Sequence, residues 1–249
     1  MLLTFDIGNT SVKLGVFDGA ELVQKRSAAT ADTSKLEAML AGVPAARYPA
    51  QNLKAIACSV VPDVTETLKA LVRRFGIGLS VIDSTVDLGL KVHYQPLASL
   101  GTDRLVNAFA ASKKYGFPVI VCSLGTATTV DLVDERGDFA GGVIAPGLSV
   151  LGKALHEATA QLPEVEITRP GSPLGTSTET AIRAGIFNGY IGLVEGLIGS
   201  LSRESAVKPK VVVTGGNLEA VAAATDLIDF EEPQLTLEGL RLIAEMKLA

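Results

Sequence analysis

The stretch LTFDIGNTSVKLGVFDG (Leu3–Gly19) has a counterpart further along the chain, VCSLGTATTVDLVDERG (Val121–Gly137). Each begins with an apolar run, turns at a glycine followed by polar residues, and continues as a second run that ends in Asp and Gly. This pattern is typical of a β-hairpin. Asp6 of the first stretch aligns with Ser123 of the second, a spacing of 117 residues that is nearly half of the chain. A repeat of this length predicts two lobes of similar architecture.

A similar succession of elements follows each hairpin. Alternating apolar runs predict further strands, and apolar side chains at helical spacing predict helices between them. The order indicates an α/β fold with two similar lobes, which we place at residues 1–113 and 114–249. The expected strands are 2–5, 11–17, 21–27, 54–60, 79–82, 119–123, 128–133, 138–144 and 210–214. The expected helices are a short one at 34–40 and longer ones at 64–75, 102–115, 148–161 and 178–201, with further helices after Gly216.

The composition narrows the class of protein. Of the 249 residues, 47% are hydrophobic and 20% are charged, and the net charge is −5. The apolar fraction supports a buried core, and the negative charge disfavours binding to nucleic acid or to an anionic membrane. The N-terminus lacks a signal-peptide pattern, and no apolar run approaches the about 18 residues of a membrane span. We therefore expect a cytoplasmic protein with no nucleic-acid or membrane partner, whose cysteines, Cys58 and Cys122, are buried and reduced.

The repeated turn has the chemistry of a phosphate site. A tight glycine turn exposes successive backbone N–H groups that suit phosphate oxygens, and neighbouring Thr or Asn side chains add donors. Asp6 suits Mg²⁺, and Lys13 can contact a transferring phosphoryl group. Two such hairpins predict a nucleotide cleft between the lobes; the strand and Gly-Gly turn of Val211–Asn217 favour this over two ordinary hairpins. The residues expected to bind the nucleotide and its phosphates are Asp6, Gly8, Asn9, Thr10, Lys13, Gly125 and Thr126.

Two other patterns are expected to be structural. GLSVLGKA (Gly147–Ala154) comes close to a P-loop, but Ala154 stands where that loop has a Ser or Thr for Mg²⁺, so a glycine-rich helix start is the better interpretation. His93 and His156 have no ligand partners at metal-binding spacing, and we expect no functional role for either. No Gly-x-Ser-x-Gly elbow is present, which disfavours acyl transfer.

The motifs, taken in order, resemble those of a known enzyme family. DIGNTSVK (Asp6–Lys13) resembles the first phosphate motif of the acetate kinase, hexokinase, Hsp70 and actin superfamily, whose members have two ribonuclease H-like lobes. The whole set resembles the type III pantothenate kinases over essentially the full chain. The other matching motifs are LGTDR (Leu100–Arg104), GTATT (Gly125–Thr129), GGVIAPGL (Gly141–Leu148), LGTSTETAIRAG (Leu174–Gly185) and VVTGG (Val212–Gly216).

The resemblance implies an activity and a set of roles. The protein would use ATP and Mg²⁺ to phosphorylate the 4′-hydroxyl of pantothenate, the first step of coenzyme A synthesis. Asp103 would be the general base and Arg104 would hold the pantothenate carboxylate, although taken alone they also fit a helix cap and a solvated charge. The resemblance also implies a homodimer with the pantothenate pocket near its interface. The implied substrate-binding residues are Tyr94, Gly101, Thr102, Asp103, Arg104 and Thr178.

Ser123 departs from the family pattern. The family usually has Asp at this position, where it helps to bind the monovalent cation, K⁺ or NH₄⁺, that many members require. A neutral hydroxyl is a poorer ligand for a hard cation, so we expect weak or absent dependence on K⁺. Asp131 and Asp134, further along the second hairpin, remain open as partial replacements for the lost charge. Two alternatives remain open: a catalytically weak regulatory protein on the same fold, and a kinase of another small acid.

Overall fold

The chain folds into two compact units. The computed structural model describes residues 1–41, 43 and 53–248. The first unit contains residues 1–90, 94–110 and 234–249, and the second contains residues 91–93 and 111–233. Each unit has one five-stranded sheet.

The first sheet has the strand order β3-β2-β1-β4-β5. β1, β2 and β3 form an antiparallel meander, while β4 and β5 extend the sheet in parallel from β1. Parallel neighbours need crossover connections, and α2 supplies the one between β4 and β5. The strands are β1 (Leu2–Ile7), β2 (Ser11–Asp18), β3 (Glu21–Ala29), β4 (Lys54–Ser59) and β5 (Leu79–Ile82); the helices are α1 (Thr33–Ala41), α2 (Pro62–Arg74), the 3₁₀ turn η3 (Leu97–Ser99), α3 (Thr102–Tyr115), whose last turns belong to the second unit, and α7 (Leu235–Leu248).

The second sheet repeats this topology, as the repeated hairpins predict. Its order is β10-β9-β6-β7-β8, with an antiparallel meander from β6 to β8 and parallel pairing of β6 with β9 and of β9 with β10. Even the register shift in the pairing of β2 with β3, between Val16 and Phe17, recurs in the pairing of β7 with β8, between Leu132 and Val133. The elements are β6 (Val119–Leu124), β7 (Ala127–Val133), β8 (Phe139–Pro146), α4 (Leu148–Glu157), α5 (Thr178–Ser202), β9 (Lys210–Thr214), α6 (Leu218–Ala222) and β10 (Phe230–Glu231).

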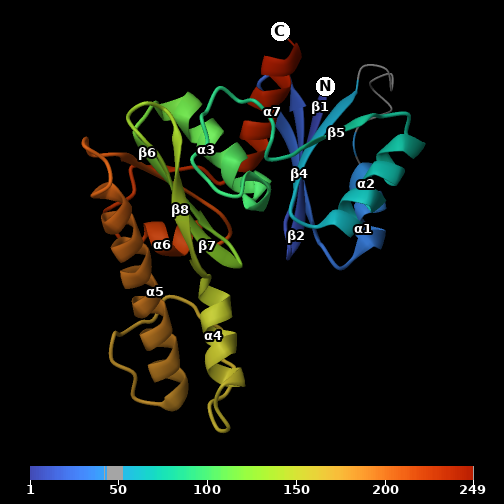
Figure 1. The fold of residues 1–249 in the computed structure, drawn as a ribbon. Helices are drawn as coiled ribbons and strands as arrows, with labels where there is room; N and C mark the ends of the chain where they lie inside the picture. Colours follow the sequence, from blue (N-terminus) through green and yellow to red (C-terminus); the bar gives the residue numbers. More distant parts are fainter. Residues whose placement is uncertain (42, 44–52, 249) are drawn as a thin grey trace. The chain divides into compact units, whose positions relative to one another are not determined.

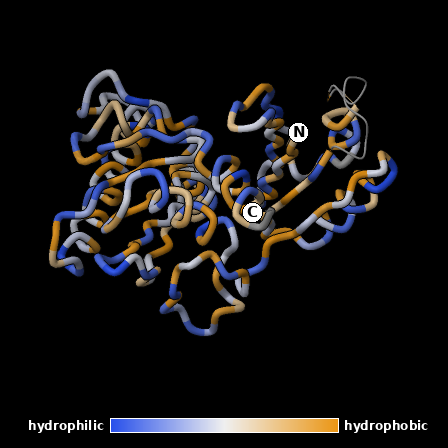
Figure 2. The backbone as a smooth tube through the Cα atoms, turned by 90° about the horizontal axis from the view of Figure 1, so that it is seen from above, coloured by the Kyte–Doolittle hydropathy of each residue, from blue (hydrophilic) through white to orange (hydrophobic). Residues whose placement is uncertain are grey.

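Apolar residues that alternate along the strands fix which face of each sheet is covered. In the first unit, Phe5 and Ile7 pack with Leu36 of α1 and Leu68 of α2, which lie on one face of the sheet (Figure 1). Along the described part of the backbone, short hydrophobic stretches alternate with hydrophilic ones (Figure 2). Asp6 lies between Phe5 and Ile7, so its side chain points to the opposite face.

The second core is built around the long helix α5. Phe187, Tyr190 and Val194 pack against β6, β7 and β9, and the Tyr190 hydroxyl lies 2.6 Å from Thr128 Oγ1. Among the described helices, α5 alone has the length and composition that could cross a membrane. Of this apolar stretch, 39% is buried, on the side of the helix that packs against this core.

The units divide the chain differently from the predicted lobes. The prediction placed residues 114–249 in one lobe, whereas α7 packs against β1, β2 and β4 of the first sheet. Gly239 of α7 approaches α3 so closely that a Cβ would lie 2.7 Å from Val106 Cγ1. An amphipathic pattern indicates that a helix covers an apolar surface but does not indicate which one. Both cysteines are free and buried, as predicted.

Candidate functional site

The first hairpin places a carboxylate and an ammonium group side by side. Asp6 near the end of β1 pairs in register with Lys13 of β2 and with Cys58 of β4. Cross-strand neighbours share one face of a sheet, and Lys13 Nζ lies 3.2 Å from Asp6 Oδ2. The Asp6 side chain is 13% exposed and that of Lys13 is 35% exposed, so solvent and ligands can reach both.

Cys58 borders this carboxylate. Its thiol donates to Asp6 Oδ1 across 3.9 Å. Burial, followed by the charges of Asp6 and Asp103, raises the pKa of the Cys58 thiol well above its ordinary value. The thiol therefore stays protonated and acts as a donor to Asp6, not as a nucleophile.

Asp103 lies in the first turn of α3, in the same unit. Burial raises the pKa of this carboxyl above its ordinary value, and the negative charge of Asp6 raises it further. Thr102 fastens this end of the helix to β4, because its Oγ1 accepts from Ser59 N–H and donates to Ser59 O, each at 3.2 Å. Gly101 leaves room for the carboxylate, since a Cβ there would lie 2.7 Å from Asp103 Oδ1. The raised pKa follows from two carboxyl groups in a poorly solvated setting, as is common in active sites.

Arg104 is held next to Asp103 by an aromatic side chain. The guanidinium lies 5.2 Å from the centroid of the Tyr94 ring, and its Nη1 donates to the Tyr94 hydroxyl at 3.4 Å. Arg104 is only 4% exposed. A buried guanidinium next to a perturbed carboxyl is suited to binding an anionic group of a substrate.

The first turn presents the side chains of Asn9 and Thr10 to solvent. Gly8 N–H closes the hairpin by donating to Ser11 O at 3.0 Å. Thr30, which directly follows β3, is hydrogen-bonded to this turn. Its hydroxyl donates to Gly8 O at 2.6 Å, and its N–H donates to Thr10 O at 3.0 Å. The turn is therefore rigid, with polar groups available to a ligand.

The second turn is one residue tighter than the first. Ser123 pairs with Thr129, six residues on, whereas Asp6 pairs with Lys13, seven residues on. Thr129 therefore stands where the first hairpin has Lys13, and both charges of the first hairpin are replaced by hydroxyls. Thr129 Oγ1 is buried and has no hydrogen-bond partner among the residues that the structure describes. When the two hairpin sequences are aligned at constant spacing, Lys13 pairs with Val130. That alignment therefore does not reveal that Thr129 takes the position of Lys13.

Two glycines from distant motifs pack on the second turn. Gly147, the N-cap residue of α4, donates its N–H to Thr126 O at 2.9 Å, and a Cβ there would lie 2.1 Å from Gly125 O. Gly215 has φ +104°, and a Cβ there would lie 2.6 Å from Leu124 N. The GGVIAPGL and VVTGG motifs thus meet at the turn that carries Gly125 and Thr126. The stretch that resembles a P-loop is a helix start, as predicted.

Gly147→Ala should lower the stability of the fold sharply. The new Cβ meets backbone atoms that cannot rotate away, a cost of about 3–5 kcal/mol in the free energy of unfolding. Gly185→Ala is the matched control, because a Cβ in this interior position of α5 meets nothing within 4 Å; it should stabilise by about 0.5–1 kcal/mol. Urea unfolding of both variants measures the difference, and equal midpoints would contradict the close packing of Gly147 on the turn.

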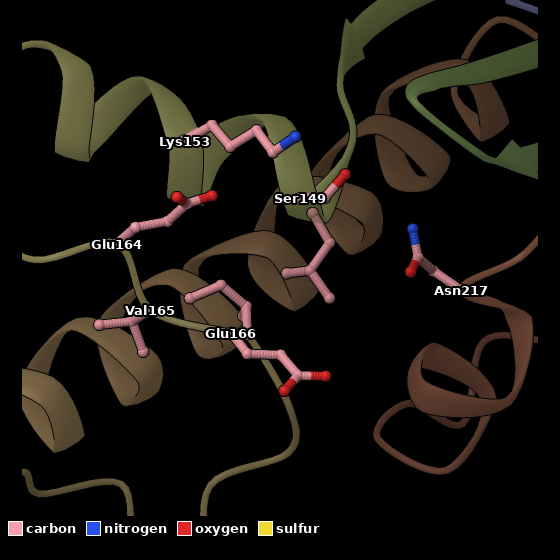
Figure 3. Close-up of a pocket in the computed structure, with 8 residues that line it drawn as sticks. Ser149, Lys153, Glu164, Val165, Glu166 and Asn217 are labelled. Carbon is pink, nitrogen blue, oxygen red and sulfur yellow. The ribbon is translucent and has the colours of Figure 1, made fainter. Parts of the chain in front are cut away.

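A pocket of about 550 Å³ opens next to this turn. Figure 3 shows Ser149 and Lys153 on α4 and Glu164, Val165 and Glu166 on the loop beyond it, with Asn217 on the far side. Asn217 is tied to the strand before the turn, because its N–H donates to Leu124 O at 3.0 Å. No motif predicted the contribution of the 164–167 loop, since its residues carry no recognisable pattern.

Thr178 belongs to a different unit from the other predicted substrate residues. It is exposed at the first position of α5, in the second unit, whereas Tyr94 and residues 101–104 belong to the first. Ser177 caps the helix in a capping box with Thr180. This cap fixes the start of α5 and leaves the Thr178 side chain available to a ligand.

The two histidines bind protein groups. His93 Nε2 lies 2.9 Å from Asp138 Oδ2, and His156 Nδ1 lies 2.7 Å from Leu162 O. Within residues 1–41, 43 and 53–248, no group of three or more His, Cys, Asp or Glu side chains is placed to hold a metal ion. A metal in this site would therefore have at most two such side chains of the described residues as ligands, Asp6 among them, together with ligand and water oxygens.

Comparison with known proteins identifies the family. The family model for type III pantothenate kinase matches residues 2–200. A type III pantothenate kinase from Dehalococcoides mccartyi is 38% identical over 254 residues, covering 100% of this chain and 98% of its own length. Another, from Methylacidiphilum infernorum, is 40% identical over 249 residues, covering 98% and 88%.

Solved structures support the fold. A Baf family protein from Campylobacter jejuni superimposes with a TM-score of 0.64 at 19% identity, covering 99% of this chain and 98% of its own. Component A of (R)-2-hydroxyglutaryl-CoA dehydratase from Acidaminococcus fermentans gives 0.52 at 15% identity, covering 96% and 94%. The architecture of two similar units is thus shared with distant proteins, while the sequence matches are to one enzyme family. The chain belongs to the type III pantothenate kinases.

Proposed function

We propose that this protein transfers the γ-phosphoryl group of ATP to the 4′-hydroxyl of pantothenate, the first step of coenzyme A synthesis. The observation that carries the proposal is the grouping of Asp6, Lys13, Asp103, Arg104 and Tyr94 in one unit, inside a chain of this family. Phosphoryl transfer depends mainly on positioning and charge stabilisation. This set provides a general base, a group that binds an anion, and the carboxylate and ammonium pair of Asp6 and Lys13 for the phosphates.

On the acceptor side, Asp103 is the general base. Its carboxylate accepts the proton of the 4′-hydroxyl as that oxygen bonds to the γ-phosphorus and the bond between the γ-phosphorus and the bridging oxygen breaks, so that ADP leaves. Arg104, oriented by Tyr94, binds the pantothenate carboxylate. Gly101 and Thr102 shape the start of α3 around the base, and Thr178 completes the pantothenate contacts.

On the nucleotide side, the two glycine turns bind phosphate oxygens. Gly8, Asn9 and Thr10 donate from the first unit, and Lys13 neutralises charge on the transferring group. Gly125 and Thr126 serve the same purpose in the second unit. The pocket between α4 and Asn217 has the size and the mixed polar lining expected for the nucleoside part of ATP.

Mg²⁺ fits the donor set near Asp6. This ion keeps most of its waters and takes one or two protein carboxylates beside substrate phosphates. Asp6 supplies such a carboxylate, already oriented by Lys13 and Cys58. When bound, the ion neutralises part of the charge on the ATP phosphates.

Turnover should not require a monovalent cation. At the positions that match Asp6 and Lys13, the second hairpin has the hydroxyl side chains of Ser123 and Thr129, so it has no carboxylate there. Hydroxyls alone bind K⁺ weakly. We further propose a homodimer acting in the cytoplasm without nucleic-acid or membrane partners, in keeping with the net charge of −5.

The proposal is tested by ADP release from ATP and Mg²⁺ with and without pantothenate, in Na⁺ and in K⁺ buffers. Pantothenate-dependent release that is equal in both buffers is expected. Ser123→Asp should introduce K⁺ stimulation of roughly tenfold or less, because a new carboxylate supplies a cation ligand. Strong and equal K⁺ stimulation of both proteins would contradict the role given to Ser123. ATP binding without turnover in either buffer would favour a regulatory protein.

A further inference from the structure

The three residues immediately before Tyr94, Lys91–His93, form a short strap that packs within the second unit. Lys91–His93 belong to the second unit, while the residues on either side belong to the first. The strap pairs in parallel with the beginning of β8: Phe139 N–H donates to Lys91 O at 2.8 Å, and His93 N–H donates to Phe139 O at 2.9 Å. Phe139 itself is completely buried. The strap is therefore attached to a rigid part of the second unit.

The side chain of His93 adds a third attachment. Its Nε2 lies 2.9 Å from Asp138 Oδ2, where an imidazole N–H donates to the carboxylate. The two side chains are 39% and 17% exposed, so the bond is only partly shielded from solvent.

Contacts with other residues of the turn between β7 and β8 hold Asp138 in place independently of His93. Its N–H donates to Asp134 Oδ1 at 3.0 Å, and its carbonyl accepts from Asp134 N–H at 2.9 Å. Arg136 holds Asp134 through two hydrogen bonds, of 3.0 and 2.7 Å, and its Nε lies 3.9 Å from Asp138 Oδ2. These contacts close the turn between β7 and β8, and the Asp138 carboxylate is a fixed acceptor.

We propose that His93 is a positioning residue for the acceptor site: by binding Asp138 it fixes the strap, and the strap fixes the backbone of Tyr94. Consecutive Cα atoms are only 3.80 Å apart, so a displaced His93 displaces Tyr94. Tyr94 in turn contacts the Arg104 guanidinium through its hydroxyl and its ring. The inference rests on the proposed role of Tyr94 and Arg104 in binding pantothenate.

This arrangement predicts a selective kinetic effect. His93 touches neither Asp103 nor the phosphate turns in the described contacts, so its loss should weaken pantothenate binding and leave the chemical step nearly unchanged. His93→Ala should raise the KM for pantothenate about fivefold, the value of one ordinary hydrogen bond, with kcat and the KM for ATP within about twofold. His93→Gln, which keeps an N–H at a similar reach, should restore most of the affinity.

A double-mutant cycle tests the connection to Asp138. Asp138→Ala should raise the pantothenate KM by a similar factor, and the double variant should be no worse than either single variant. His156→Ala is the matched control, because it removes the other histidine of the chain; it should not change the pantothenate KM. Additive effects of His93→Ala and Asp138→Ala, or a His93→Ala variant with an unchanged pantothenate KM, would overturn the inference.

Tyr94→Ala separates this inference from the function on which it rests. If Tyr94→Ala raises the pantothenate KM while His93→Ala does not, only the positioning role fails. If Tyr94→Ala also leaves that KM unchanged, the proposed role of Tyr94 fails, and the inference fails with it. If the wild-type protein shows no pantothenate-dependent turnover, the proposed function itself is wrong.

Discussion

Asp103→Asn should lower kcat for pantothenate phosphorylation by about 10² to 10⁴, the usual contribution of a positioned general base. The amide keeps the shape of the side chain but cannot accept the hydroxyl proton. The KM for pantothenate should change little, because Arg104 and Tyr94 remain in place. Steady-state ADP release at saturating ATP and pantothenate measures the loss. A kcat within threefold of wild type would contradict the assignment of the base.

The raised pKa of Asp103 gives this prediction a pH signature. The base works only when it is ionised, so wild-type kcat should fall as the pH is lowered through a pKa above that of an ordinary Asp. The residual activity of Asp103→Asn should lack this acid limb. The same raised pKa means that the ionised carboxylate costs folding free energy, and this cost grows as the pH rises through the folded-state pKa. At pH 7 the variant should therefore unfold at a urea concentration no lower than wild type, which excludes misfolding as the cause of inactivity.

Asp6→Asn should reduce kcat/KM for ATP by at least about 10- to 100-fold, the range seen when a group that orients a metal is lost. The change removes the ion pair with Lys13 and the charge that attracts Mg²⁺. The Mg²⁺ concentration needed for half-maximal rate should rise, and the pantothenate KM should not. Titration of the rate with Mg²⁺ at fixed ATP is the measurement.

A second effect of Asp6→Asn distinguishes it from general damage. The charge of Asp6 is one cause of the raised pKa of Asp103, so its removal should move the acid limb of kcat to lower pH. Glu21→Gln is the control, since it removes an exposed carboxylate from the same sheet; it should alter neither the Mg²⁺ requirement nor the acid limb. An Asp6→Asn variant with an unchanged Mg²⁺ requirement would contradict the proposed role of Asp6.

Much of the fold could be predicted from the repeated hairpin. Strand alternation and glycine turns are local signals, and the two sheets appear where the hairpins predict them, with the same topology. The placement of α7 could not be predicted, because it depends on which apolar surface is left uncovered after the chain has folded. The tighter second turn also escaped prediction, since one residue less in a loop leaves no mark on an alignment at constant spacing.

In the candidate site, too, some features could be predicted from the sequence and others could not. The motifs containing Asp6 and Asp103 could be found because the chemistry requires particular residues at a strand end and at a helix start. The contact of Arg104 with Tyr94, ten residues away, depends on the path of an irregular loop. The bond between His93 and Asp138 joins positions 45 residues apart, and no local pattern in the sequence indicates it.

The most direct test of the central claim is identification of the product by ³¹P NMR after the purified protein is incubated with ATP, Mg²⁺ and pantothenate. For the wild-type protein, a phosphomonoester signal from 4′-phosphopantothenate that grows with ADP is expected. The same signal should be almost absent with Asp103→Asn. Formation of ADP without that phosphomonoester, or an equal amount of it from the variant, would contradict the account.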